Sequence, residues 1–320
     1  MLQTPYCVDF LLHNGAFSTQ KATAMSTEKI SAILNTRMQL GECPIWHPQE
    51  AALYWIDIDG RAVHRFDPAS KAHRHWPMPS EPGCIAINAT GGLIVALRSG
   101  LELLDTDSGQ LSMIAAAPYD PETTRFNDGR CDAAGRLWIG TIYEPRTHPD
   151  AALFCIEHAA IRDSGKRATV SNGVAFSPDN KTLYHADTTS HQIRAYEYDL
   201  TKGTLGNSRV LKQFSTDKLN NYGGRPDGAA VDSEGAYWCA MYEGGRLLRL
   251  SPDGDVLNEI TLPVRCPTMM AFGGEDLRTL YITTVSKNRP AAELEQYPLS
   301  GCVLSLQVDV PGLAEHAYRP

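Results

Sequence analysis

The sequence predicts an all-β fold, a six-bladed β-propeller with a central metal site, from three features. A triplet of mainly aliphatic and aromatic residues recurs at intervals of 40 to 54 residues, a spacing typical of propeller blades. Long helical periodicity is absent, which excludes folds whose parallel strands are joined by helices. Polar residues also recur upstream of the triplets. The six triplets are Leu53-Tyr54-Trp55, Leu93-Ile94-Val95, Leu137-Trp138-Ile139, Leu183-Tyr184-His185, Tyr237-Trp238-Cys239 and Leu280-Tyr281-Ile282.

The first 35 residues precede the repeats and show no alternation of apolar and polar residues. Their apolar stretch at residues 8–12 is too short for a signal peptide and has no cationic flank. We therefore expect residues 1–35 to be a flexible N-terminal extension and residues 36–320 to form a single propeller domain. Met25 is a second candidate for the natural start of the protein.

Each repeat has the same order of predicted strands. In the fourth, an apolar strand at 173–176 is followed by a turn, the triplet strand at 182–186 and an alternating strand at 192–198. Turns rich in Asp, Asn, Gly and Pro reverse the chain, and four short antiparallel strands make one blade. We expect residues 33–40 to complete the last blade, begun by 280–284 and 302–308, and so to close the ring.

Composition limits the partners of the protein. The net charge is −8 with no run of Lys or Arg, and no apolar run is long enough to span a membrane. Nucleic acids and membranes are therefore not expected as partners. The eight cysteines lack metal-binding spacing, which favours reduced thiols in a cytoplasmic protein. The sequence does not indicate the oligomeric state.

The site is predicted from one repeated position, ten or eleven residues before each triplet. Its residues are Glu42, Pro82, Asn127, Asn172, Asp227 and Met269. In a radial arrangement these residues meet at one mouth of the central channel, and four of them carry side-chain oxygens. Carboxylates and carboxamides confined together repel one another unless a cation compensates them. Oxygen ligands favour Ca²⁺, Mg²⁺ or Mn²⁺, with Zn²⁺ and Fe²⁺ as further candidates for the single divalent ion.

Four segments resemble the signatures of the senescence-marker-protein/gluconolactonase family, which includes regucalcin. They are Gly41-Glu42-Cys43-Pro44-Ile45-Trp46, Arg125-Phe126-Asn127-Asp128-Gly129, the segment 171–179 and Pro226-Asp227-Gly228. The resemblance extends over residues 36–310. It implies a sugar lactonase with one catalytic divalent metal, held by Glu42, Asn172 and Asp227. It also implies that Arg125 and Asn127 contact the substrate, and it adds Glu144 to the substrate-binding set.

Opening a lactone requires an activated water molecule and stabilisation of charge on the carbonyl oxygen, both of which a metal ion supplies. We expect Asp227 to be the base, because a metal-bound aspartate can keep its second oxygen free for the water. The expected substrate is a pentono- or hexonolactone, selected by loops at 141–152 and 216–225. Two alternatives stay open: a non-catalytic calcium-binding or interaction propeller, and a metal-dependent esterase or organophosphate hydrolase using the same site.

Overall fold

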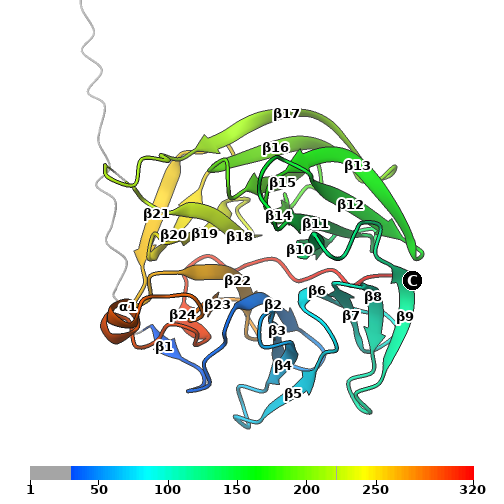
Figure 1. Ribbon diagram of the computed structural model, residues 1–320, viewed down its shortest axis with the longest axis horizontal. Helices are drawn as coiled ribbons and strands as arrows, with labels where there is room; N and C mark the ends of the chain where they lie inside the picture. The colour runs from blue at the N-terminus through cyan, green and yellow to red at the C-terminus, as the bar shows by residue number, and fades with distance from the viewer. Residues whose placement is uncertain (1–29, 221) are drawn as a thin grey trace, which may run out of the picture.

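The computed structural model describes residues 30–220 and 222–320. Most of the predicted N-terminal extension, with Met25, lies outside the described residues. The described chain forms six four-stranded antiparallel sheets arranged around a central axis (Figure 1). The predicted all-β six-bladed propeller is therefore confirmed.

Five blades each consist of four consecutive strands, ordered from the central channel outwards. Blade 1 contains β2 (Gly41–His47), β3 (Ala52–Asp57), β4 (Ala62–Phe66) and β5 (His73–Pro77). Blade 2 contains β6 (Pro82–Ile87), β7 (Leu93–Leu97), β8 (Gly100–Leu104) and β9 (Leu111–Ala116). Blade 3 contains β10 (Thr124–Cys131), β11 (Leu137–Tyr143), β12 (Ala151–Glu157) and β13 (Ala160–Ala168). Blade 4 contains β14 (Ser171–Phe176), β15 (Thr182–Asp187), β16 (Gln192–Asp199) and β17 (Thr204–Gln213). Blade 5 contains β18 (Arg225–Val231), β19 (Tyr237–Tyr242), β20 (Arg246–Leu250) and β21 (Val256–Thr261).

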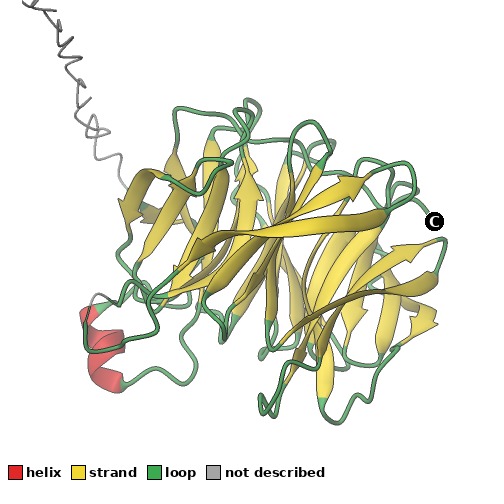
Figure 2. Ribbon diagram, turned by 90° about the horizontal axis from the view of Figure 1, so that it is seen from above, coloured by secondary structure: helices red, strands yellow, loops and turns green. Residues whose placement is uncertain are grey.

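Blade 6 closes the ring with strands from both ends of the chain. It contains β22 (Pro267–Gly273), β23 (Thr279–Thr284), β24 (Leu304–Gln307) and, on the outside, β1 (Ser31–Ala32). Closure by an N-terminal strand agrees with the prediction, but its position at 33–40 was wrong. Hydrophobic side chains from that stretch, including Met38, instead pack into an apolar cluster formed by blades 1 and 6. Residues 31–35 thus belong to the propeller and not to the extension. One short helix, α1 (Ala291–Gln296), lies between β23 and β24 (Figure 2).

Buried aspartates in the inner turns fix two of the triplet strands. The indole Nε1 of Trp138 donates a hydrogen bond to Asp132 Oδ2 at 3.2 Å, and Trp238 donates likewise to Asp232 at 2.8 Å. An arginine also pairs with each carboxylate, as Arg136 Nε does with Asp132 Oδ2 at 2.7 Å. Because these buried charges are paired and hydrogen-bonded, the tryptophans can pack at blade cores without leaving a polar group unsatisfied.

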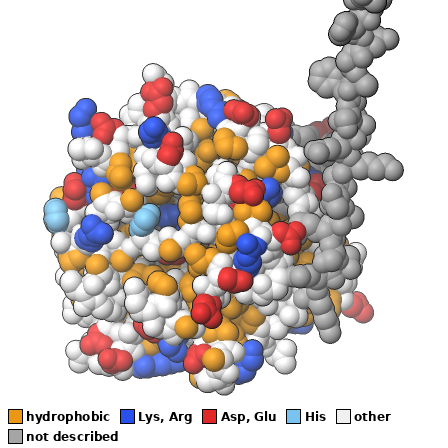
Figure 3. Space-filling model, turned by 180° about the vertical axis from the view of Figure 1, so that it is seen from behind, with side chains coloured by type: hydrophobic (Ala, Val, Ile, Leu, Met, Phe, Trp, Pro, Cys, Tyr) orange, Lys and Arg blue, Asp and Glu red, His pale blue; other side chains and the backbone are white. Residues whose placement is uncertain are grey.

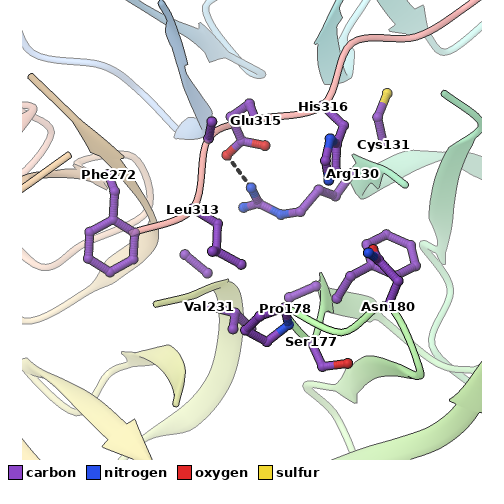
Figure 4. A pocket seen from close by; sticks show the side chains of 14 residues that line it. Arg130, Cys131, Ser177, Pro178, Asn180, Val231, Phe272, Leu313, Glu315 and His316 are labelled. Atoms are coloured by element: carbon purple, nitrogen blue, oxygen red, sulfur yellow. Dashed lines mark hydrogen bonds and ion pairs between the residues drawn. The ribbon is translucent and has the colours of Figure 1, made fainter. Parts of the chain in front are cut away.

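The inner strands all run in the same direction along the channel, so the channel has two distinct ends. Residues at the ends of β10, β14, β18 and β22 line a cavity of about 250 Å³ (Figure 4). The C-terminal residues 309–320, here called the C-terminal strap, cross the middle of the ring (Figure 1) and contribute to this cavity. Glu315 of the strap forms an ion pair with Arg130 of β10, and Tyr318 is buried beside blade 2. The strap therefore occupies the channel end opposite the predicted site.

The surface carries interspersed charges of both signs on the face shown in Figure 3. Within residues 30–220 and 222–320, no helix has the length and apolar character needed to cross a membrane.

Candidate functional site

Five of the six predicted site residues line one cavity of about 140 Å³ at the start of the inner strands. They are Glu42 on β2, Arg125 and Asn127 on β10, Asn172 on β14, and Asp227 on β18. Glu42 is half-buried, and the other four residues are buried. Residues from four blades thus meet where the repeat predicted that they would.

A β-bulge lies at or next to each of the four polar residues at the repeated position. Pairing with the second strand of the blade is interrupted between Glu42 and Ile45, after Phe126, after Asn172 and after Pro226. Bulges re-aim side chains and increase local twist, which turns these residues towards the channel. Glu42 and Asn172 are the last paired residues before their bulges. Asn127 and Asp227 are the first residues inside theirs, which accounts for the offset of ten rather than eleven residues.

A chain of hydrogen bonds orients both carboxamides. Arg125 Nη1 donates to Asn127 Oδ1 at 2.8 Å, and Asn127 Nδ2 donates to Asn172 Oδ1 at 2.9 Å. Asn172 Nδ2 then donates to Thr188 Oγ1 at 2.8 Å, whose own proton goes to Pro226 O at 2.7 Å. Since Thr188 is committed as a donor to Pro226, it accepts from the Asn172 amide nitrogen. The oxygen of Asn172 is thereby fixed on the opposite side, towards Asn127.

Neither the half-buried carboxylate of Glu42 nor the buried one of Asp227 accepts a hydrogen bond from a cationic side chain of the described residues. Glu42 Oε2 accepts a hydrogen bond from its neighbour Cys43 N at 3.2 Å, and none of the described residues donates a hydrogen bond to the Asp227 carboxylate. Burial, with repulsion from Asp227 and Asp128, raises the pKa of Glu42 well above its usual value. Burial and Asp128 raise the pKa of Asp227 to about 8. The site therefore holds two carboxylates that have no hydrogen-bonded cationic partner among the described residues.

Asp128 lies in the same bulge as Asn127 but does not line the cavity. Its Oδ2 accepts a hydrogen bond from Val174 N of blade 4 at 2.7 Å, while its buried Oδ1 has no partner. Burial raises the pKa of Asp128 to about 6. Asp128 thus links blades 3 and 4 beside the site.

Glu144 is the predicted site residue that does not line the cavity. Both of its carboxylate oxygens accept hydrogen bonds from Arg98, each at 3.0 Å. Its Oε1 also lies 3.6 Å from Arg125 Nε. In this structure Glu144 acts on the site through Arg125 rather than by facing the cavity itself.

The cavity residues that were not singled out from the sequence include Thr188, Arg146 and Arg225. Thr188 follows a triplet strand in a polar stretch that carries no repeat signal. Arg146 and Arg225 lie in the two segments, 141–152 and 216–225, that were expected to form the rim. Their basic character within loops expected to select the substrate is the feature of the sequence that could have identified both as site residues.

Comparison with known proteins identifies the family and agrees with the fold. Residues 40–286 match the family described as the SMP-30/Gluconolactonase/LRE-like region. A 6-deoxy-6-sulfogluconolactonase from Pseudomonas putida is 48% identical over 293 residues, which cover 91% of this chain and 99% of the relative. Regucalcin from Gallus gallus is 32% identical over 303 residues, covering 92% and 99%.

Among solved structures, a calcium-binding protein, regucalcin, from Agrobacterium tumefaciens superposes with a TM-score of 0.85. It is 26% identical, and the match covers 92% of this chain and 98% of that one. These matches confirm the predicted resemblance and, with it, the prediction of an enzyme of the gluconolactonase type. The chain belongs to the SMP-30/gluconolactonase/LRE-like family.

Proposed function

We propose that the protein hydrolyses a small aldonolactone to the aldonic acid in the 140 Å³ cavity, with one divalent cation and with Asp227 as the base. The observation that carries this proposal is the convergence of two carboxylates, neither hydrogen-bonded to a cationic side chain of the described residues, with an oriented carboxamide and an arginine. The names of the relatives support the substrate class, since the Pseudomonas protein is a sugar lactonase.

The residues present fit a divalent cation. Glu42, Asp227 and Asn172 would hold it through oxygen atoms. Burial, with repulsion between carboxylates, raises the pKa of both carboxyls, and a bound cation would oppose this rise. When bound, such an ion would polarise the lactone carbonyl and acidify a water molecule. Oxygen ligands favour Ca²⁺, Mg²⁺ or Mn²⁺, and the calcium-binding Agrobacterium protein supports this class. No three His, Cys, Asp or Glu side chains in the described ranges form a metal-binding group, so the carboxamide of Asn172 is an essential part of the proposed set.

Asp227 is the proton carrier in this proposal. In the proposed reaction, its carboxylate takes a proton from the attacking water as the water oxygen bonds to the lactone carbonyl carbon. The ring C–O bond then breaks, and Asp227 returns the proton to the departing ring oxygen. The positive charges of Arg225, Arg146 and Arg125 oppose the rise in its pKa and favour the ionised form that a base requires.

Arg125 and Asn127 have different proposed roles, one in contacting the substrate and the other mainly in positioning Asn172. Both amide hydrogens of Asn127 are already committed, to Ser171 O at 2.8 Å and to Asn172 Oδ1 at 2.9 Å. Asn127 can therefore offer a substrate hydroxyl only its oxygen, and its main effect is to position Asn172. Arg125 keeps guanidinium donors beyond Nη1 for a sugar oxygen, and its planar fork suits that contact.

A pH-indicator assay tests the proposal with D-glucono-, L-arabino- and D-xylonolactones, before and after EDTA and with each divalent metal restored. We expect acid release that EDTA abolishes and a metal restores. Asp227→Asn should lose turnover, whereas Asp253→Asn, a matched change in an exposed turn, should keep it. Metal binding without acid release on any lactone would reject the lactonase and favour the calcium-binding propeller.

The seven cysteines in the described ranges are all free and buried. Reduced thiols support the predicted cytoplasmic location, because free cysteines persist in reducing compartments. Fractionation of the native host with antibody detection would test this.

A further inference from the structure

The lining of the cavity contains three arginines but only two acidic residues. Arg125 comes from β10, Arg146 from the loop between β11 and β12, and Arg225 from the first position of β18. A divalent cation held by Glu42 and Asp227 would balance the charge of these carboxylates and leave the three guanidinium groups without a carboxylate partner among the lining residues. A neutral sugar lactone does not require three cationic groups at its binding site.

We propose that Arg146 and Arg225 form a subsite for an anionic substituent of the lactone. This substituent would be a sulfonate, phosphate or carboxylate at a carbon distant from the reacting carbonyl. The proposal rests on the lactonase function proposed above. Guanidinium groups match such anions because their donors form a planar fork that bonds two oxygens at once. The name of the Pseudomonas relative includes one such group, a sulfonate.

Arg225 is a partly unsatisfied donor. Its Nε is buried and has no hydrogen-bond partner, and its guanidinium lies 5.1 Å from the centroid of the Tyr242 ring. Its ion pair is long, with Nη2 3.4 Å from Glu243 Oε2. Glu243 is shared with Lys218 at 3.4 Å and Arg289 at 3.8 Å, so one carboxylate serves three cations. Arg225 therefore retains positive charge and donor capacity.

Arg146 is the least restrained of the three. None of the described residues forms a hydrogen bond or ion pair with its guanidinium, although the charge lies near enough to Asp227 to oppose the rise in that carboxyl's pKa. The backbone around it is defined: Arg146 N donates to Tyr143 O at 3.0 Å, and its φ of 53° is in the left-handed region. The turn at Arg146 thus presents an exposed guanidinium at the cavity that none of the described residues pairs.

Arg125 differs from this pair and serves as an internal comparison. Its Nη1 is committed to Asn127 Oδ1 and Phe126 O, and Glu144 lies 3.6 Å from its Nε. It therefore belongs to the hydrogen-bond chain of the reacting centre. Loss of Arg125 should lower kcat/KM for all lactones alike, whereas loss of Arg146 or Arg225 should lower it more strongly for the anionic lactones.

The test compares kcat/KM for D-gluconolactone with that for its 6-deoxy-6-sulfonate, its 6-phosphate and the 6-carboxylate D-glucarolactone. We expect the wild-type protein to prefer at least one anionic lactone by tenfold or more, and the three arms identify which anion. Arg146→Gln and Arg225→Gln should each lower that preference about tenfold, and raising the salt concentration should raise KM for the anionic lactone more than for the neutral one. Arg278→Gln, an exposed arginine with a 4.0 Å ion pair to Asp276, is the matched control and should keep the preference.

No preference in the wild-type protein, or equal losses on neutral and anionic lactones in both variants, would overturn the subsite. Calorimetric titration with 6-deoxy-6-sulfogluconate, glucarate and gluconate separates this outcome from failure of the lactonase proposal. If no lactone is hydrolysed, tighter binding of either dianion than of gluconate, weakened in both variants, still supports the subsite. Equal affinities for all three acids would reject it.

Discussion

Replacing Asp227 with asparagine should stabilise the metal-free protein while it abolishes turnover. Burial raises the pKa of Asp227 from 3.8 to about 8, and repulsion from Asp128 adds to the effect. Because the folded state holds this proton more tightly than the unfolded state, stability falls as the pH rises between 3.8 and about 8. Below that window the carboxyl is protonated in both states, so the substitution should change little.

The size of the effect follows from the shift. About four pKa units at about 1.36 kcal/mol each set an upper limit of about 5 kcal/mol for ionising the buried carboxyl. Side-chain relaxation and water entry lower the cost. Even a third of the limit, about 2 kcal/mol, would raise Tm by about 4 °C.

Differential scanning calorimetry of EDTA-treated protein at pH 4 and pH 8.5 measures this. Asp227→Asn should raise Tm at pH 8.5 and leave it nearly unchanged at pH 4. The control is Asp132→Asn, which should destabilise at pH 8.5 because it leaves the buried Arg136 without its carboxylate partner. Saturating divalent cation should stabilise the wild type more than the Asp227 variant. An equal rise at both pH values, or no rise at pH 8.5, would refute the reasoning.

Three further substitutions test individual contacts. Arg125→Lys should lower kcat/KM on a lactone by about tenfold or more, because one ammonium cannot replace a planar fork bonded to two acceptors; an unchanged value would contradict this role. Thr188→Val should weaken metal binding about tenfold in calorimetric titrations, because Asn172 loses the hydroxyl that orients its carboxamide. An unchanged affinity for the metal would exclude Asn172 as a ligand that Thr188 orients. Glu315→Gln should lower the free energy of unfolding in urea by about 3 kcal/mol, because Arg130 loses its buried carboxylate, and a loss below 1 kcal/mol would show that the strap contributes little.

Much of the fold was predictable because each blade forms from local sequence. Turn residues and period-two alternation lie within about forty residues, so strand order and blade number could be derived before any contact was known. The closing strand could not be placed in the same way. Ser31–Ala32 has no alternation of its own, and its position depends on pairing with Leu304–Gln307 at the other end of the chain.

The site was predictable to the extent that it repeats. Glu42, Asn127, Asn172 and Asp227 were found because equivalent positions of a ring share one mouth, and the structure places them at one cavity. The bulges beside them were not found, since a bulge is defined by register against a neighbouring strand. Glu144 was assigned to the substrate, but the sequence could not show that Arg98 binds both of its oxygens.

By itself, the sequence determined the number of blades and the polar residues of the inner ring, because both follow from a repeat that is local and periodic. Tertiary structure decided which rim cations reach the cavity, how Thr188 orients Asn172, and which carboxylates are left without a cationic partner. Those features depend on distances between loops and strands that are far apart along the chain. Such distances are set only when the ring closes and neighbouring blades pack together.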